Sequence, residues 1–192
     1  MFGRASPSWG RRPAKFSILL AGVWLFASLG AVRPASAQEV GPSQVKAAFL
    51  YNFAKFVEWP PGTFANGQAA ITLCILQREP LAQALESLQG KEVHGRKLVV
   101  RRSRDIEELK KCQIFFASAS EKPALAKIMG ALREAPVLTV TDEVDDFARL
   151  GGIINLTRVE DKIRFAISVD NAEKRSLKIS SQLLKLAIPA SN

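Results

Sequence analysis

The chain has 192 residues and a formal net charge of +9, and 47% of its residues are hydrophobic. This length is enough to bury a core without metals or many disulfides, so we expect one ordinary globular domain. A single histidine and two cysteines exclude a zinc cluster of the usual kind.

The first 37 residues predict a secretory signal peptide. A largely apolar run at 16–32, without a charged residue, is followed by Ala35-Ser36-Ala37, which is the small-residue pattern of a cleavage site. We therefore expect cleavage near Ala37-Gln38, a single mature domain at 38–192 and a location outside the cytoplasm. An uncleaved membrane anchor is the alternative, because a run of about 17 residues is at the short limit for a membrane span.

Most of the net positive charge belongs to this leader, which holds five basic residues and no acidic one. The five are Arg4, Arg11, Arg12, Lys15 and Arg33. The remainder has 27 − 5 = 22 basic residues against 18 acidic ones, a net charge of +4. A charge this mild does not indicate a nucleic-acid partner.

The mature chain begins with a predicted helix from Pro42 to about Glu58. Its apolar residues fall into two stripes and leave little polar surface. The stripes consist of Val45, Phe49, Phe53 and Phe56, and of Ala47, Leu50, Ala54 and Val57. Such a helix must be buried on two sides, either within its own domain or partly against another protein. Prolines and a glycine at 60–62 end it.

After residue 70, short apolar runs alternate with amphipathic segments. Strands are expected at 71–76, 97–102, 114–118 and 136–141, and helices at 80–88, 105–111 and 123–133. A hairpin is predicted from 151–156 and 162–169, and then a helix over 171–187 with a break near Lys178. This alternation predicts an α/β fold with three layers, α/β/α, around a mainly parallel sheet.

The two cysteines, Cys74 and Cys112, both lie in the exported part. In an oxidising compartment an isolated pair most often forms one disulfide, and two separate buried thiols are the alternative. Cys74 is inside the first expected strand and Cys112 just precedes the third, so a bond would bring those strands together. The resulting 2-1-3-4-like strand order agrees with the common doubly wound arrangement.

Little in the sequence points to catalysis. His94 is the only histidine, and no Gly-x-Ser-x-Gly nucleophile elbow is present. An acidic run at 142–146 follows the fourth strand, at the edge where α/β folds place ligands. Carboxylates such as Asp142 and Asp145 could hold a cation or serve a hydrolase, although a solvated loop is the more common structure of such a run. We expect a non-enzymatic protein without a cofactor.

Several blocks of the mature chain resemble the YfiR-like family of periplasmic proteins. The opening block is VKAAFLYNFAKFVEWP at 45–60, and the closing block is LKISSQLL at 177–184. Further blocks match at 71–76, 90–96, 112–116, 151–155 and 164–167. The resemblance covers about 43–188, and the polar residues that we single out in its motifs are Asn52, Asn155, Arg164 and Lys178.

The resemblance implies a regulator that acts by binding. Family members bind the periplasmic sensor part of a YfiN-like inner-membrane diguanylate cyclase and hold it inactive, which lowers cyclic di-GMP and biofilm formation. Cys74 and Cys112 match the family's redox-linked pair, so redox modulation of the repression is one expectation and a purely structural bond is the other. A homodimer and a small-molecule effector are further options that the sequence leaves open.

The apolar first helix offers a surface for such a partner. The partner-binding candidates are Tyr51, Phe53, Phe56 and Trp59, and for each of them packing in the domain's own core is the alternative. For Asn155 and Arg164, a buried hydrogen-bonded pair and a ligand contact are equally open. A second class of function is a periplasmic small-ligand receptor, with its pocket near Asp142 to Asp146 and Gly151.

Overall fold

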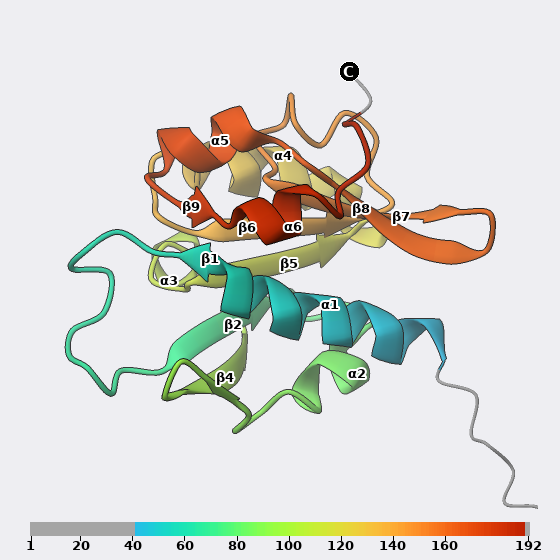
Figure 1. Ribbon diagram of the computed structural model, residues 1–192. Helices are drawn as coiled ribbons and strands as arrows, with labels where there is room; N and C mark the ends of the chain where they lie inside the picture. The colour runs from blue at the N-terminus through green and yellow to red at the C-terminus, as the bar shows by residue number, and fades with distance from the viewer. Residues whose placement is uncertain (1–40, 191–192) are drawn as a thin grey trace, which may run out of the picture. The chain divides into compact units, whose positions relative to one another are not determined.

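The computed structural model describes residues 41–190, and Figure 1 shows how their helices and strands are arranged. The signal peptide expected at 1–37 lies outside the described residues. The helices are α1 (Pro42–Phe56), α2 (Ala82–Glu86), α3 (Ile106–Leu109), α4 (Lys122–Ala131), α5 (Val169–Lys174) and α6 (Ser181–Leu184). The strands are β1 (Val57–Glu58), β2 (Ile71–Ile75), β3 (Glu92–Val93), β4 (Arg96–Arg102), β5 (Ile114–Ser118), β6 (Leu138–Asp142), β7 (Ile154–Val159), β8 (Lys162–Ile167) and β9 (Lys178–Ile179).

Seven of the strands form one curled, mixed sheet in the order β3-β4-β2-β5-β6-β7-β8. The five central strands, β4, β2, β5, β6 and β7, pair in parallel with their neighbours. The edge strands β3 and β8 pair antiparallel with β4 and β7. The α/β class is confirmed, and so is the expected order of the first four strands, β4-β2-β5-β6. The regular, mainly parallel three-layer arrangement is not confirmed, because hairpins close both edges and make the sheet mixed.

The segment after β8 differs from the expected long helix. The prediction of a helix over 171–187 is wrong in its middle, where α5 ends and β9 begins, although the break near Lys178 is confirmed. β9 pairs antiparallel with β1, so that Ile179 lies opposite Val57. Ser180 then caps α6, because its hydroxyl oxygen accepts a hydrogen bond from the backbone N–H of Leu183. Pairing with a distant strand has overridden the local helical pattern.

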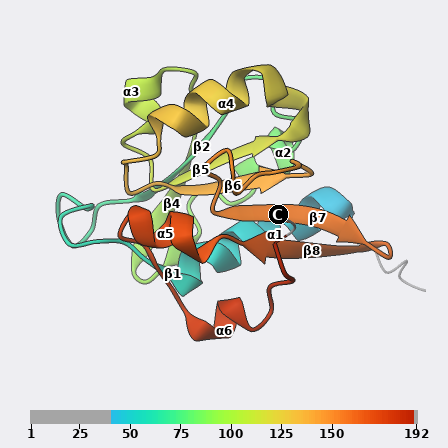
Figure 2. The ribbon, with the colours of Figure 1, turned by 90° about the horizontal axis from the view of Figure 1, so that it is seen from above.

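Side chains alternate between the two faces of the sheet, as the pleat of a strand requires. Ile71, Leu73 and Ile75 of β2 belong to the core cluster that also contains the buried residues of α1 and α2. Cys74, between them, belongs to a second cluster with the buried residues of α3 and α4. Figure 2 shows α3 and α4 on one side of the central strands and α1 on the other. The sheet is therefore buried on both faces.

The first helix is anchored by its middle turns. Ala47, Leu50, Phe53 and Ala54 are buried, and the ring of Phe53 meets the ring of Phe165 edge-on at 5.1 Å between centroids. Pro42 is well placed in the first turn, because backbone N–H groups have no helical acceptor there. Within residues 41–190, no helix is both long enough and apolar enough to cross a membrane.

The expected disulfide between Cys74 and Cys112 is present, with the two Cα atoms 6.0 Å apart. Cys74 lies in β2, and Cys112 lies two residues before β5, the parallel neighbour of β2. Both residues are buried, at 1% and 4% exposure. The bond therefore joins two strands through the face that α3 and α4 cover.

Removing this bond should destabilise the domain measurably. The cysteines are 38 residues apart. In the chain-entropy estimate, closing a loop of that size raises the free energy of the unfolded chain by about 4 kcal/mol, because the chain loses conformational entropy. We expect the Cys74→Ala/Cys112→Ala variant to lose about 2–4 kcal/mol of unfolding free energy in urea titrations. Reduced wild-type protein serves as the matched control. Equal stability of the oxidised protein and the variant would contradict the expectation.

Candidate partner-binding groove

A two-stranded sheet fixes the chain where α1 ends. Val57 pairs with Ile179 and Glu58 pairs with Lys178, both in the antiparallel sense. The backbone N–H of Ser180 also donates to the backbone carbonyl of Phe56 at 2.9 Å. The end of the first helix is thereby held against the segment that links α5 to α6.

A groove of about 330 Å³ opens beside this junction. Its apolar wall is formed by the end of α1, the chain that follows and the start of β2. Its polar residues come from α1, β1, the β3–β4 hairpin and the link between β9 and α6. The lining residues are Lys55, Phe56, Val57, Glu58, Trp59, Phe64, Ile71, His94, Arg96 and Ser180. Apolar surface with a polar rim is the usual composition of a protein-binding site.

Trp59 is held at this groove by contacts on two sides. Its indole Nε1–H donates to the backbone carbonyl of Gln113 at 3.1 Å, and its ring meets Phe64 at a centroid distance of 6.0 Å. The guanidinium carbon of Arg96 lies 4.0 Å above the ring centroid of Phe64. Arg96 also donates to the carbonyls of Asn66 and Ala69, which fixes the loop.

Phe64 and Arg96 were not among the residues singled out for this role by the sequence. Arg96 is the last residue of the block at 90–96 that resembles the YfiR-like family, so the sequence did mark it as part of a motif. Phe64 lies in a loop without periodicity, and only the fold shows that it faces Trp59. Two sequence-distant segments therefore complete the groove.

His94 lies in the tight turn between β3 and β4. His94 and Gly95 have φ angles of +50° and +73°. Positive φ at both central residues is the geometry of the hairpin turn whose twist matches the strands. The imidazole Nε2 lies 2.8 Å from the backbone carbonyl oxygen of Lys55, so it ties the hairpin to α1.

The four aromatic candidates do not share one surface. Phe56 and Trp59 line the groove and are half-buried. Tyr51 is half-buried one turn earlier, where its hydroxyl donates to the carbonyl of Glu92 at 2.8 Å. The ammonium group of Lys55 lies 4.3 Å from the centroid of the Tyr51 ring. Phe53 has no exposed surface, so it packs the core and offers nothing to a partner in this conformation.

The motif polar residues are also scattered. Asn155 and Arg164 lie on the paired strands β7 and β8 but do not face each other, since their opposite residues are Ala166 and Thr157. Arg164 is exposed. Asn52 of α1 and Lys178 of β9 are exposed as well. The option of a buried Asn155–Arg164 pair is therefore wrong.

Asn155 instead fastens the loop after β6. Its Oδ1 accepts from the hydroxyl of Thr141 at 2.8 Å and from the backbone N–H of Val144 at 3.3 Å. Its Nδ2 donates to the carbonyl of Val144 at 3.1 Å. This buried side chain thus holds the acidic run in place, which is a structural role.

Three of the four carboxylates in the acidic run form ion pairs. Asp142 is buried at the end of β6, where its Oδ2 lies 2.7 Å from Nζ of Lys46 on α1. Asp145 pairs with Lys122 at 3.3 Å, and Asp146 pairs with Arg149 at 2.9 Å. No group of acidic, histidine or cysteine side chains within residues 41–190 is arranged to hold a metal ion.

A second buried carboxylate, Glu79, lies near the same edge of the sheet. Its Oε2 accepts from the backbone N–H and the hydroxyl of Ser118, and its Oε1 accepts from the backbone N–H of Leu81. Burial raises the pKa of Glu79, the hydrogen bonds lower it, and the negative charge of Asp142 raises it further; the net shift is upward. The sequence gives no sign of this burial, because Glu79 lies in a polar stretch beside Arg78 and Pro80.

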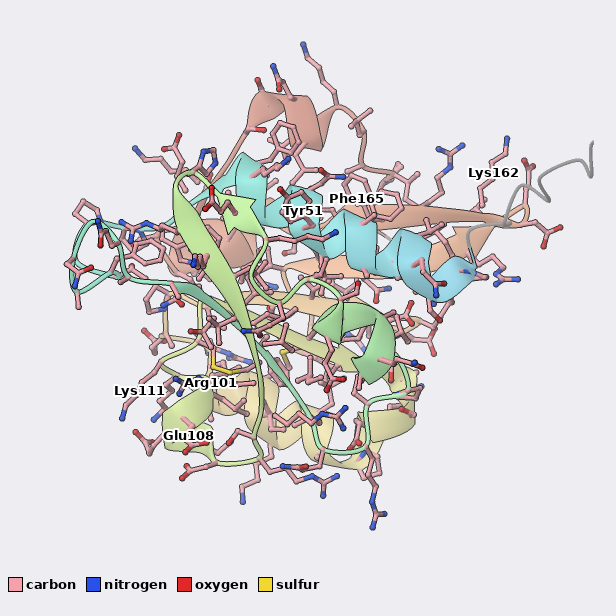
Figure 3. The ribbon with its side chains drawn as sticks, turned by 90° about the horizontal axis from the view of Figure 1, so that it is seen from below. Tyr51, Arg101, Glu108, Lys111, Lys162 and Phe165 are labelled. Carbon is pink, nitrogen blue, oxygen red and sulfur yellow. A yellow bond between two sulfur atoms is a disulfide. The ribbon has the colours of Figure 1, made fainter. Side chains whose placement is uncertain are left out.

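A cavity of about 500 Å³ lies beside the disulfide. Figure 3 shows Arg101 of β4 and Glu108 and Lys111 of the α3 segment next to the yellow sulfur–sulfur bond. All three residues line the cavity together with both cysteines. Arg101 and Lys111 have no acidic partner among residues 41–190, and Glu108 is the one carboxylate in the lining of this cavity.

The raised pKa of Glu79 predicts a specific dependence on pH. Stability that comes from its protonated form is complete below about pH 4.5 and is lost as the pH rises through the higher folded-state pKa. We expect carboxyl ¹³C NMR to give Glu79 a titration midpoint above 4.5. Asp142→Asn should lower that midpoint, whereas Asp161→Asn, which removes an exposed distant charge, should not. A midpoint at or below 4.5 would contradict the expectation.

The fold of this protein is similar to that of a protein of known structure. A crystal structure of a conserved domain protein from Vibrio cholerae O1 biovar El Tor strain N16961 superposes with a TM-score of 0.53 at 13% sequence identity. The match covers 78% of this chain and 60% of that one, so this chain spans three fifths of the solved protein. At this identity the likeness concerns the fold alone.

No curated protein matches the chain. The description of the family that does match, over residues 43–188, is YfiR/HmsC-like. This range begins at the second residue of α1 and includes the groove, the disulfide and the β1–β9 pairing. The protein therefore belongs to the YfiR/HmsC-like family.

Proposed function

We propose that this protein is a periplasmic repressor that binds the periplasmic sensor part of a YfiN-like diguanylate cyclase in the inner membrane. The observation that carries the proposal is the family match over residues 43–188. That family suggests a periplasmic regulator of cyclic di-GMP signalling. The proposed repression would lower cyclic di-GMP and, with it, biofilm formation.

The groove at the end of α1 supports a binding role. Phe56, Trp59 and Phe64 present half-buried aromatic surface there, and Trp59 is held in one orientation by its bond to Gln113. Ordered, partly exposed aromatic side chains lose little conformational entropy when a partner covers them. Tryptophan is also among the residues that most often dominate binding energy. We assign the groove as the contact for the cyclase.

The mechanism would be a shift of populations. A protein that binds the inactive conformation of the cyclase more tightly than the active one lowers the active fraction. The ratio of its affinities for the two conformations limits how far the equilibrium can shift. No chemistry is required of the repressor.

The disulfide supplies a way to modulate that binding. A cavity with Arg101, Glu108 and Lys111 in its lining opens beside the bond and offers a route by which a reductant could reach it. Reduction would remove the covalent link between β2 and the segment that precedes β5, and only the hydrogen bonds of the β2–β5 pair would then hold them together. β2 begins at Ile71, a lining residue of the groove, so the two sites are joined by one strand.

A small-ligand receptor remains the second candidate. The volume of the groove, about 330 Å³, lies within the range of small-molecule pockets, which is roughly 300–1,000 Å³. The pocket expected near Asp142 to Asp146 is less suitable, because three of these carboxylates are engaged by basic side chains. A receptor would raise its melting temperature with ligand in the absence of any partner protein.

Capture from membranes tests the repressor proposal. Tagged mature protein should recover a diguanylate cyclase from detergent-solubilised membranes of its own source. Trp59→Ala should reduce the affinity by about 30-fold, which corresponds to about 2 kcal/mol for an interface tryptophan. Leu186→Ala is the matched control, since Leu186 is 68% exposed and lies outside the groove.

Circular dichroism should first establish that both variants are folded. Equal capture by the two variants would remove the groove from the proposal, and the absence of any cyclase would overturn the repressor function. A second arm adds reductant during the capture. Unchanged recovery there would exclude redox modulation and leave the disulfide with its structural role.

A further inference from the structure

A cluster of basic side chains surrounds a small cavity between the end of α4 and α5. The cavity has a volume of about 240 Å³, and the loop after β6 completes its wall. Its lining residues are Arg133, Ala148, Arg149, Gly151, Asn171, Lys174 and Arg175. Four of the seven are cationic and none is acidic, and Ala148 offers the only apolar side chain. This lining excludes a metal ion and an apolar ligand.

Arg175 forms the buried base of the cluster at 3% exposure. Nε donates to the carbonyl of Arg133, Nη1 to the carbonyl of Val137 and the hydroxyl of Thr139, and Nη2 to the carbonyl of Gly151 at 2.6 Å. Four of the five N–H groups of a guanidinium are thus used, and one on Nη2 is left.

No carboxylate within residues 41–190 forms an ion pair with Arg175. Burial lowers its pKa to about 10, and the positive charge of Arg133 contributes to the same shift. The side chain stays cationic at neutral pH, so the fold holds a buried charge that only neutral oxygens surround. An isolated buried charge is costly, and an anion beside it would offset that cost.

The mouth of the cavity is formed by exposed cations. Arg133 and Lys174 have no acidic partner among the described residues, whereas Arg149 pairs with the exposed Asp146 at 2.9 Å. Gly151 turns the loop here with a φ of +93°, a backbone conformation that suits glycine. Asn171 braces the same loop through bonds from Nδ2 to the carbonyls of Ala148 and Gly152.

We propose that this cavity, named the Arg175 site for its base, binds a phosphate group. Guanidinium and ammonium donors on several sides suit a compact oxyanion, because charge-assisted hydrogen bonds to phosphate are the strong ones. The phosphate could belong to a free phosphate or phosphomonoester, or to a lipid headgroup. The site involves none of the residues that line the groove at the end of α1, so it stands whether or not that groove binds a cyclase.

NMR of the arginine Nε–Hε signals tests the site with inorganic phosphate at constant ionic strength. The Arg175 signal should shift in a saturable way, and chloride should not reproduce the shift. Arg133→Gln/Lys174→Gln should weaken phosphate binding by about tenfold or more, because two charged donors are lost. Lys127→Gln/Lys185→Gln removes the same charge at exposed positions outside the cavity and should leave the affinity unchanged.

A second arm measures sedimentation with vesicles of phosphatidylglycerol and phosphatidylcholine. Binding to these vesicles that the Arg133→Gln/Lys174→Gln variant loses would identify a lipid headgroup as the source. Saturable binding of inorganic phosphate without vesicle binding would identify a free phosphate. Absence of both responses, or equal weakening by the Lys127→Gln/Lys185→Gln control, would overturn the proposal.

Discussion

The burial of α1 against the sheet is the constraint on which the rest of the structure depends. Phe53 is fully enclosed, and its ring meets those of Phe49 and Phe165 at centroid distances of 5.9 and 5.1 Å. Burying one such side chain contributes about 1.5–3 kcal/mol, and each aromatic pair adds about 0.5–1.5 kcal/mol. Once α1 is docked, the chain after Phe56 can pair with β9, and the groove is formed.

Buried polar side chains then fix the connections between elements. Lys46 joins α1 to Asp142 at the end of β6, and Asn155 holds the loop that follows. Glu79 and Arg175 organise two further loops by bonding to backbone groups. Each of these groups would be costly to bury alone, so its partners are effectively required. The loops of this domain are therefore defined by hydrogen bonding as much as by packing.

The architecture of this domain suits the proposed role of a repressor that acts by binding. A repressor that acts by binding needs a stable surface and no reactive centre. The groove at the end of α1 supplies ordered aromatic side chains, and the disulfide reaches it through β2. The Arg175 site uses separate residues, so an anion there would act on α5 and, through the short link to β9, on the edge of the groove.

The sequence by itself determined the α/β class, the order of the first four strands, the disulfide and the family. These features follow from local periodicity, from the compartment of Cys74 and Cys112, and from motif identity. Only the tertiary structure decided that β9 pairs with β1, that Phe53 is enclosed while Trp59 is half-exposed, and that Arg133 and Lys174 meet above Arg175. The physical reason is that these outcomes depend on contacts between distant segments, and such contacts leave no period or spacing in the chain.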